Sequence, residues 1–243
     1  FDNLGDGRHG THNSINLNSD GTRIIFGRPS GDSSTAQSKV YEYSEVTETW
    51  SQMGSNFGSP GYMYVQDLNG AGTRAIIGTF RPLPGTTSDL EGFGYIYDWD
   101  DTTSSWILYT DASGESNFTE GAGGNDEITY TVAGTGTRSW GQAGAISEDG
   151  NVVAWSQPRW GPGTGNPGNT GRVQIFSYDD TTSTWSKMGD DIVGEKLWGE
   201  REGQKVRLNG DGTIITISTT FSDTDWTVDS GPTTHTNEGQ VRV

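Results

Sequence analysis

Two short sequence patterns recur along the chain and constrain its fold more than any other feature. A 12-residue string that ends in Trp occurs three times, as KVYEYSEVTETW, YIYDWDDTTSSW and QIFSYDDTTSTW (Lys39–Trp50, Tyr95–Trp106 and Gln174–Trp185). A Gly-turn string occurs four times, as INLNSDGTRIIFG, VQDLNGAGTRAIIG, GAISEDGNVVAWS and VRLNGDGTIITIS (Ile15–Gly27, Val65–Gly78, Gly144–Ser156 and Val206–Ser218). Self-similarity of this kind indicates an array of equivalent structural units.

Each pattern predicts a β-hairpin, because apolar runs flank a tight polar turn. The turn glycines of the second pattern are Gly21, Gly72, Gly150 and Gly212. Two hairpins per repeat give four antiparallel strands, which is one propeller blade. The sequence therefore predicts an all-β fold: a β-propeller, or a fragment of a larger one, with about four blades in repeats 10–60, 61–139, 140–202 and 203–243. The fourth copy stops within its third strand, at Gly239–Val243. Either the natural chain continues or another segment completes that sheet, and we favour continuation.

Composition supports a folded β protein and narrows its partners. Only 30% of the residues are hydrophobic, but 9 Trp, 9 Tyr and 8 Phe supply a core. The formal net charge of −17 disfavours binding to nucleic acid and to anionic membrane surfaces. No apolar stretch approaches a membrane span, and the absence of Cys excludes disulfides.

The repeats resemble the FG-GAP family, which includes the propellers of integrin α-subunits. The resemblance is carried by Trp140-Gly141, by Phe26–Pro29, by the L-N-x-D-G-T turns and by the T-W end of each blade. It covers nearly the whole chain, through motifs that are short and degenerate. It implies adhesion, ligand binding or scaffolding outside the cell, and in some blades a calcium loop.

Length variation is confined to one predicted face of the propeller. The turns within each hairpin are short and uniform, whereas the loops between the second and third strands differ, at Arg28–Ser38, Thr79–Gly92, Gln157–Gly171 and Thr219–Glu238. The largest insertion, Thr110–Ser139, belongs to the same face. Variable loops on a rigid scaffold commonly carry function, so we place a protein or glycan ligand on this long-loop face. Tolerated sequence drift is the alternative.

Five residues of the long loops are candidate ligand contacts. Arg beside Pro recurs after the second strand, at Arg28, Arg81 and Arg159, where guanidinium groups could grip carboxylates or sulfates. Trp160 and Trp226 lie within long loops, where aromatic rings could stack on sugars or fill partner pockets. The alternatives are local ion pairs for the Arg residues and loops folded over their own Trp. By contrast, Trp50, Trp106 and Trp185 occupy equivalent repeat positions, which predicts blade packing.

Calcium is the one cofactor that the pattern leaves open. Ca²⁺ needs six to eight oxygen ligands from alternating positions. The best copies offer Asn16, Asn18 and Asp20 in the first repeat and Asp67 and Asn69 in the second. No copy holds three carboxylates, and Arg207 replaces the first ligand in the fourth, so we favour hairpin turns without metal.

No enzyme signature is present: the chain has no G-x-S-x-G elbow, H-E-x-x-H or Walker loop. We therefore expect a non-enzymatic binding, adhesion or scaffold module outside a cell or on a virus particle, which binds a partner or packs in a larger assembly. A lectin-like glycan binder is the alternative. A polysaccharide hydrolase or lyase, which would need two carboxylates about 5–10 Å apart, is less favoured.

Overall fold

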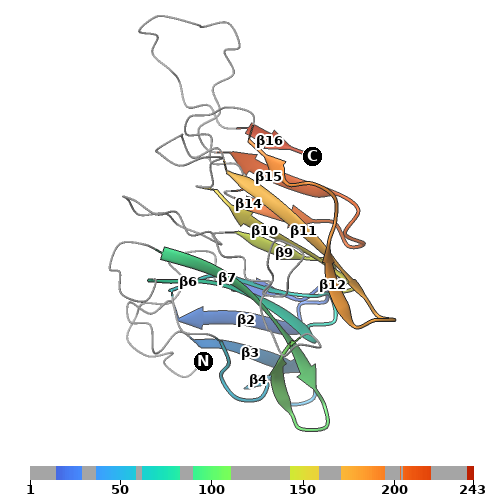
Figure 1. Cartoon of the computed structure of the whole chain (residues 1–243). Helices are drawn as coiled ribbons and strands as arrows, with labels where there is room; N and C mark the ends of the chain where they lie inside the picture. The colour runs from blue at the N-terminus through green and yellow to red at the C-terminus, as the bar shows by residue number, and fades with distance from the viewer. Residues whose placement is uncertain are drawn as a thin grey trace, which may run out of the picture.

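The computed structural model describes residues 15–28, 37–58, 62–82, 90–110, 143–158, 171–194, 203, 205–219 and 240–243. These residues form sixteen strands in four antiparallel sheets, which follow one another as the blades of a propeller (Figure 1). The all-β propeller fold predicted from the repeats is thus confirmed. The part of the chain described contains no helix that could cross a bilayer.

The first two blades are four-stranded meanders in which each strand pairs with the next along the chain. The strands of blade 1 are β1 (Ile15–Leu17), β2 (Arg23–Arg28), β3 (Gln37–Ser44) and β4 (Thr49–Gln52). The strands of blade 2 are β5 (Tyr62–Leu68), β6 (Arg74–Pro82), β7 (Leu90–Asp100) and β8 (Ser105–Leu108). Each blade therefore consists of the two hairpins that the two repeated strings predicted.

The third blade repeats this order and the fourth has three described strands. Blade 3 contains β9 (Gly144–Ile146), β10 (Val152–Gln157), β11 (Arg172–Asp179) and β12 (Thr184–Lys187), and β13 (Ile192–Val193) pairs with the start of β11. Blade 4 contains β14 (Lys205–Leu208), β15 (Ile215–Thr219) and β16 (Gln240–Arg242). β16 is the outermost described strand of this sheet.

One predicted loop boundary is wrong. The loop expected at Thr79–Gly92 is shorter, because β6 runs on to Pro82 and pairs with β7 from Leu90 onward. Pro82 stands in the last pair of the ladder, where a residue without an N–H is tolerated. The alternating residues of this stretch therefore extend the hairpin, and only residues 83–89 lie between the strands.

The hairpin turns explain why the repeated strings keep their polar residues. Gly21, Gly72, Gly150 and Gly212 all have positive φ, between 66° and 81°, which glycine adopts without steric cost. The second hairpin of each complete blade instead uses a four-residue turn that ends in a non-glycine residue with positive φ, at Glu48, Ser104 and Ser183. Equivalent turns thus have equivalent backbone conformations.

Packing between blades forms the hydrophobic core. We call the side of each sheet that meets the previous blade its leading face and the opposite side its trailing face. Three clusters fill the three interfaces. Their central members are Ile25, Val40, Leu68, Ile77 and Trp106 between blades 1 and 2; Val65, Ile96, Ile146 and Trp155 between blades 2 and 3; and Ala145, Val173, Val206 and Ile217 between blades 3 and 4.

The four blades form an open arc. The inner strands make the contacts between blades: β1 and β2 meet β5, β5 and β6 meet β9, and β9 and β10 meet β14. Among the described strands, no comparable contact joins blade 4 to blade 1. Figure 1 agrees, with the first sheet at one end of the array and the fourth at the other.

Candidate functional site

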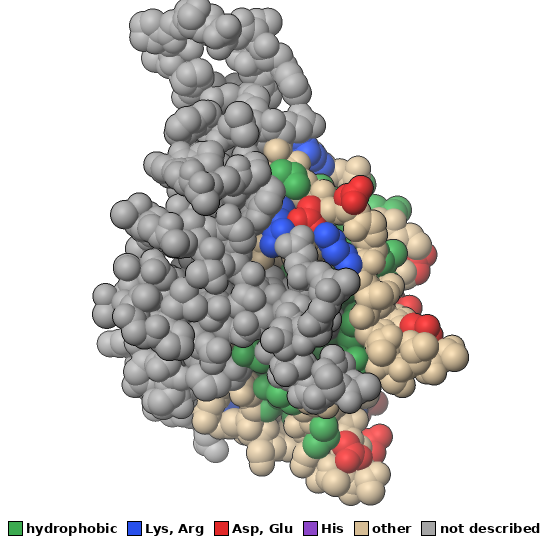
Figure 2. Space-filling view, viewed as in Figure 1, with side chains coloured by type: hydrophobic (Ala, Val, Ile, Leu, Met, Phe, Trp, Pro, Cys, Tyr) green, Lys and Arg blue, Asp and Glu red, His purple; other side chains and the backbone are tan. Residues whose placement is uncertain are grey.

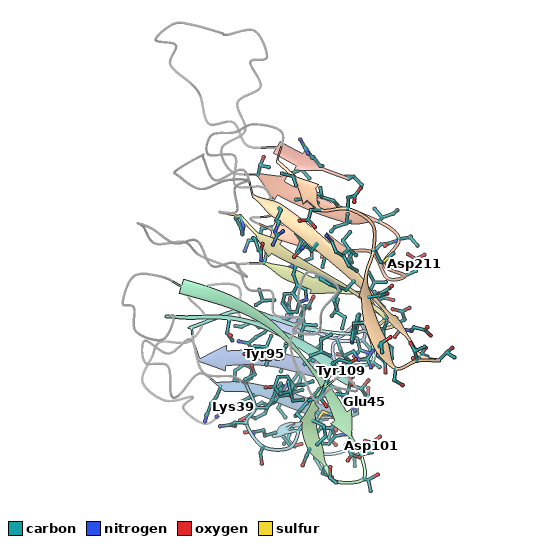
Figure 3. The ribbon with its side chains drawn as sticks, viewed as in Figure 1. Lys39, Glu45, Tyr95, Asp101, Tyr109 and Asp211 are labelled. Atoms are coloured by element: carbon teal, nitrogen blue, oxygen red, sulfur yellow. The ribbon has the colours of Figure 1, made fainter. Side chains whose placement is uncertain are left out.

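The two edges of the blades differ in chemistry. The turns within hairpins share one side, which we call the turn face; Glu45, Asp101 and Asp211 mark it in Figure 3. The second and third strands of each blade are rooted at the opposite, long-loop face. Acidic side chains follow the turn face in the space-filling view (Figure 2). This distribution repels anionic partners from the turn face.

Asp residues of the turn face close their own turns. Asp20 Oδ1 accepts the Thr22 N–H at 2.8 Å and the Thr22 hydroxyl at 2.6 Å, and Asp211 Oδ1 accepts the same two groups of Thr213 at 3.1 and 2.6 Å. The hydroxyl bond is the main reason that the pKa of each of these two carboxyls lies below its usual range. These carboxylates therefore have a structural use.

The second hairpins use the same device. Asp100 accepts hydrogen bonds from the Thr102 N–H and the Thr103 hydroxyl, at 2.8 and 2.7 Å, and the hydroxyl bond chiefly lowers its pKa. Asp179 accepts the Thr181 N–H at 2.8 Å, and this backbone bond chiefly lowers its pKa. The repeated D-D-T-T sequence is thus a turn signal.

The calcium candidates point in different directions. Asn16 Nδ2 donates to the Gln66 carbonyl of the next blade at 2.6 Å, whereas Asn18 Oδ1 accepts the Arg23 N–H of its own hairpin at 2.8 Å. In blade 2, Asn69 Oδ1 likewise accepts the N–H groups of its own hairpin, those of Thr73 and Arg74, at 2.8 and 2.9 Å. The described residues contain no group of three or more His, Cys, Asp or Glu placed to hold a metal ion. These hydrogen bonds give Asn16, Asn18 and Asn69 structural roles, and the calcium site stays a prediction.

Asp67 stands at the inner edge of blade 2. Its two carboxylate oxygens accept the N–H of Leu68 at 3.0 Å and the N–H of Ile146, in blade 3, at 3.3 Å. Loss of hydration raises its pKa to about 6, against the opposing influence of the Arg207 charge and of the two N–H groups. Asp67 therefore joins consecutive blades, and it titrates in a range in which an exposed Asp does not.

A buried ionic network lies at the long-loop edge of blade 3. Arg172, which is 4% exposed, donates through Nε to Gln157 and through Nη1 to Asp191 at 2.7 Å. Gln174 donates to the other oxygen of Asp191 at 3.1 Å, and Lys187 pairs with that same oxygen. Burial alone would raise the pKa of Asp191, but the bonds from Lys187 and Gln174 and the Arg172 charge together lower it. We call these five residues the blade 3 anchor.

The anchor fixes the two strand ends between which residues 158–171 run. Gln157 ends β10 and Arg172 begins β11, and the two residues are paired across the ladder. A buried, hydrogen-bonded Arg is costly to leave without its carboxylate, so the network holds this edge in one arrangement. The chain that carries Arg159 and Trp160 therefore leaves from a rigid base.

The predicted ligand contacts lie mostly outside the described residues. Arg159, Trp160 and Trp226 are not described. The backbone of Arg28 ends β2 and that of Arg81 lies in β6, so both begin at the long-loop edge, as the repeat alignment implied. Their side chains are outside the description, and the predicted contacts stay predictions.

The packing role predicted for the repeated Trp residues is confirmed at two positions. Trp106 is 8% exposed, and its indole N–H reaches back to the Met53 carbonyl of blade 1 at 3.0 Å. Trp185 packs against the cluster between blades 2 and 3. Trp50 sits on the leading face of blade 1 and contacts Tyr43, with ring centroids 5.3 Å apart.

Sequence reasoning missed the anchor and the role of Asp67 between blades. One signal was available for the anchor, because a polar residue directly follows each of the four Gly-turn strings. Thr79, Gln157 and Thr219 hold this position in blades 2 to 4 and are all buried. A polar residue repeated at a buried position indicates a polar layer beneath the long-loop edge.

Comparison with known proteins does not assign the chain to a family. No protein-family model and no curated protein matches the chain. The tricorn protease is 9% identical over 90% of this chain and 20% of that chain, with a TM-score of 0.45. Hydrazine synthase from Kuenenia stuttgartiensis is 11% identical over 89% of this chain and 44% of that chain, with a TM-score of 0.41. An acylaminoacyl peptidase from Pyrococcus horikoshii is 10% identical over 87% of this chain and 28% of that chain, with a TM-score of 0.42. The chain spans less than half of each of these proteins, and likeness at this level carries no statement about activity.

Proposed function

We propose that the chain is a non-enzymatic propeller module of the kind built from FG-GAP repeats, which binds a partner or packs in an assembly at the surface of a cell or virus particle. One observation carries the proposal: the described charged groups with assigned contacts are used to hold turns and blades in place. Asp20 and Asp211 close turns, Asp67 joins two blades, and Asp191 belongs to the blade 3 anchor. Such a framework is stiff and can present loops.

The distribution of charge supports different roles for the two faces, with the partner bound at the long-loop face. The turn face is acidic and closed by its own hydrogen bonds, so it keeps the module soluble and apart from anionic surfaces. The repeat predicts that the basic candidates Arg28, Arg81 and Arg159 lie on the long-loop face. A partner with carboxylate or sulfate groups would meet these guanidinium groups there.

A glycan ligand is the second candidate, favoured by the blade 3 anchor. The anchor makes a rigid base for the segment that contains Trp160, and a stacking aromatic ring needs such support to bind without a large ordering cost. Trp226, in the equivalent segment of blade 4, would act with it.

A binding and turnover experiment tests both candidates. The chain and its Trp160→Ala and Trp226→Ala variants are applied to a glycan array, with Trp50→Ala, a change outside the long loops, as the matched control. Binding lost in the first two variants and kept in the control establishes the lectin, whereas no binding by any of them favours a protein partner. Turnover of a polysaccharide or peptide substrate by the purified chain would overturn the non-enzymatic proposal.

A further inference from the structure

The two ends of the arc carry the two halves of contacts that neighbouring blades make with each other inside the chain. The leading face of blade 1 exposes Ile15 and Leu17, which are 59% and 54% accessible. At the next two interfaces the equivalents of Leu17 are buried: Leu68 and Ile146 are 5% and 7% exposed. The equivalent in blade 4, Leu208, is partly buried against the cluster between blades 3 and 4. At Ile15 and Leu17, blade 1 thus exposes a surface that inner blades use for contact, and among the described strands no other blade makes a comparable contact with it.

A chain of backbone hydrogen bonds runs along the turn face and stops at both ends. The Ser19 N–H donates to the Gly70 carbonyl at 3.2 Å, the Gly70 N–H to Glu148 at 2.8 Å, and the Glu148 N–H to Gly210 at 2.8 Å. These four residues are equivalent in the four blades. Among the described residues, the relay leaves the Gly210 N–H as its last donor and the Ser19 carbonyl as its first acceptor.

Each inner turn glycine is covered by a side chain of the previous blade, and this contact is missing at both ends of the arc. The residue two after each turn glycine packs over the turn glycine of the next blade: a Cβ atom at Gly72 would lie 2.6 Å from Arg23 Cδ, and one at Gly212 would lie 2.6 Å from Val152 Cβ. At Gly21 a Cβ atom would meet nothing within 4 Å. The equivalent residue at the other end, Ile214, is 51% exposed.

In blade 4, the inner-strand position that joins consecutive blades makes no described hydrogen bond outside its own blade. Asn16 and Asp67 reach from their trailing faces to the backbone of the next blade, at 2.6 and 3.3 Å. Arg207 holds this position in blade 4, and its described hydrogen bond is to the Val206 carbonyl beside it. The apolar Val241 lies on the same trailing face and is 63% exposed.

We propose that a second copy of the chain docks head to tail, with the trailing face of blade 4 on the leading face of blade 1. In this arrangement Ile214 covers Gly21, the Gly210 N–H donates to the Ser19 carbonyl, and Arg207 donates to the backbone of β1. The chain itself carries both halves of the contact, in the register used by its three internal interfaces. Two copies close the arc into a ring of eight blades, a number found in propellers. This contact goes beyond the proposed function, because it needs no ligand on the long-loop face.

The test is the mass of the chain in solution, measured by light scattering after size-exclusion chromatography from low to high micromolar concentration. The expected mass is twice 26.2 kDa. Leu17→Asp and Ile214→Asp each place a charge in the contact and should weaken association at least about tenfold. The control is Ile107→Asp, a change at a residue that is 49% exposed on β8 and belongs to neither end face. Circular dichroism establishes that all three variants remain folded.

Mixing the variants distinguishes head-to-tail docking from other dimers. A Leu17→Asp copy keeps its blade 4 face and an Ile214→Asp copy keeps its blade 1 face, so the mixture retains one intact contact and should recover dimeric mass. A monomer at every concentration overturns the proposal, as does a dimer that Ile214→Asp leaves unchanged. A mass above the dimer overturns the closed ring of two copies.

Discussion

The leading faces of blades 1 and 2 have the same design and different surroundings. On blade 2, Leu68, Ile77 and Trp106 lie against blade 1 and are at most 8% exposed. On blade 1, Leu17 at the position of Leu68 is 54% exposed, and Trp50 at the position of Trp106 contacts Tyr43. The comparison teaches that the repeat specifies an interface, whereas the neighbour decides whether that interface contributes stability.

The largest expected difference is between Trp106→Ala and Trp50→Ala. Removal of the buried Trp106 leaves a cavity between two blades and an unpaired Met53 carbonyl, and should cost about 3–5 kcal/mol of unfolding free energy. Removal of Trp50, on the open face, should cost about 1 kcal/mol or less. Urea unfolding of dilute protein measures both. Equal losses would mean that blade 1 has a neighbour on its leading face.

Asp67→Asn should change the pH dependence of stability. The pKa of Asp67 is about 6 in the fold and 3.8 ordinarily, so the folded state favours the protonated carboxyl. The wild type therefore loses stability as pH rises from about 4 to about 6, by about 2–3 kcal/mol, and Asn, which occurs at this position as Asn16, removes that loss. The advantage of the variant over the wild type should grow between acid and neutral pH.

Asp211→Asn is the control of opposite sign. Its carboxyl has a lowered pKa, so the stability that it contributes is present above its ordinary pKa and is lost as pH falls. Thermal melts of both variants and of the wild type between about pH 3 and 8, a range that spans the titration of both carboxyls, measure how each stability difference depends on pH. A pH-independent difference for Asp67→Asn would contradict the burial assigned to it.

Substitution of turn glycines separates backbone strain from blade contact. Gly21→Ala and Gly212→Ala both place a side chain at positive φ, which costs about 1–2 kcal/mol. Only at Gly212 does the new methyl group also meet Val152, so this variant should lose about 1–2 kcal/mol more. Chemical denaturation measures the difference on protein diluted below the range in which it dimerises, because in the proposed dimer Ile214 of a second copy covers Gly21. Equal losses would show that blades 3 and 4 are not packed as described.

The smallest expected change in unfolding free energy comes from the turns of the second hairpins, and it should be the same in blades 1 and 2. Glu48→Gly and Ser104→Gly remove a side chain from positive φ in equivalent turns, and the relief of about 1–2 kcal/mol is partly offset by the greater freedom of Gly in the unfolded chain. Each variant should gain at most about 1 kcal/mol in unfolding free energy. Because the strain is local, a gain at one turn and a clear loss at the other would show that the turns are not equivalent.

The strands and turns were predictable because each depends on local chemistry. The D-G-T and D-D-T-T turns carry their signal in adjacent residues, so the strand order and the positive φ of Gly21 and its equivalents followed from the repeat. The end of β6 did not, because Pro82 is compatible with both a strand end and a loop. The blade 3 anchor joins Gln157, Arg172 and Asp191 across three segments, and no local pattern links them.

The direction of the candidate calcium ligands was also beyond local reasoning. Asn16 and Asn18 are two residues apart and face the same side of a strand in the sequence pattern. In the fold, Asn16 donates to the next blade and Asn18 accepts within its own hairpin, because Asn16 lies in β1 and Asn18 lies past the end of that strand. Spacing alone could not distinguish a metal loop from this pair of structural bonds.

The central claim is that equivalent turns of consecutive blades are joined side by side around one axis. Residue-resolved amide hydrogen exchange tests it at the Gly70 and Glu148 N–H groups, which donate to the next blade at 2.8 Å each. The account predicts that both amides exchange slowly, as those at strand centres do, although they lie in exposed turns. Exchange as fast as that of Val46, which is 94% exposed in an outer turn, would mean that the blades are not arranged in this way.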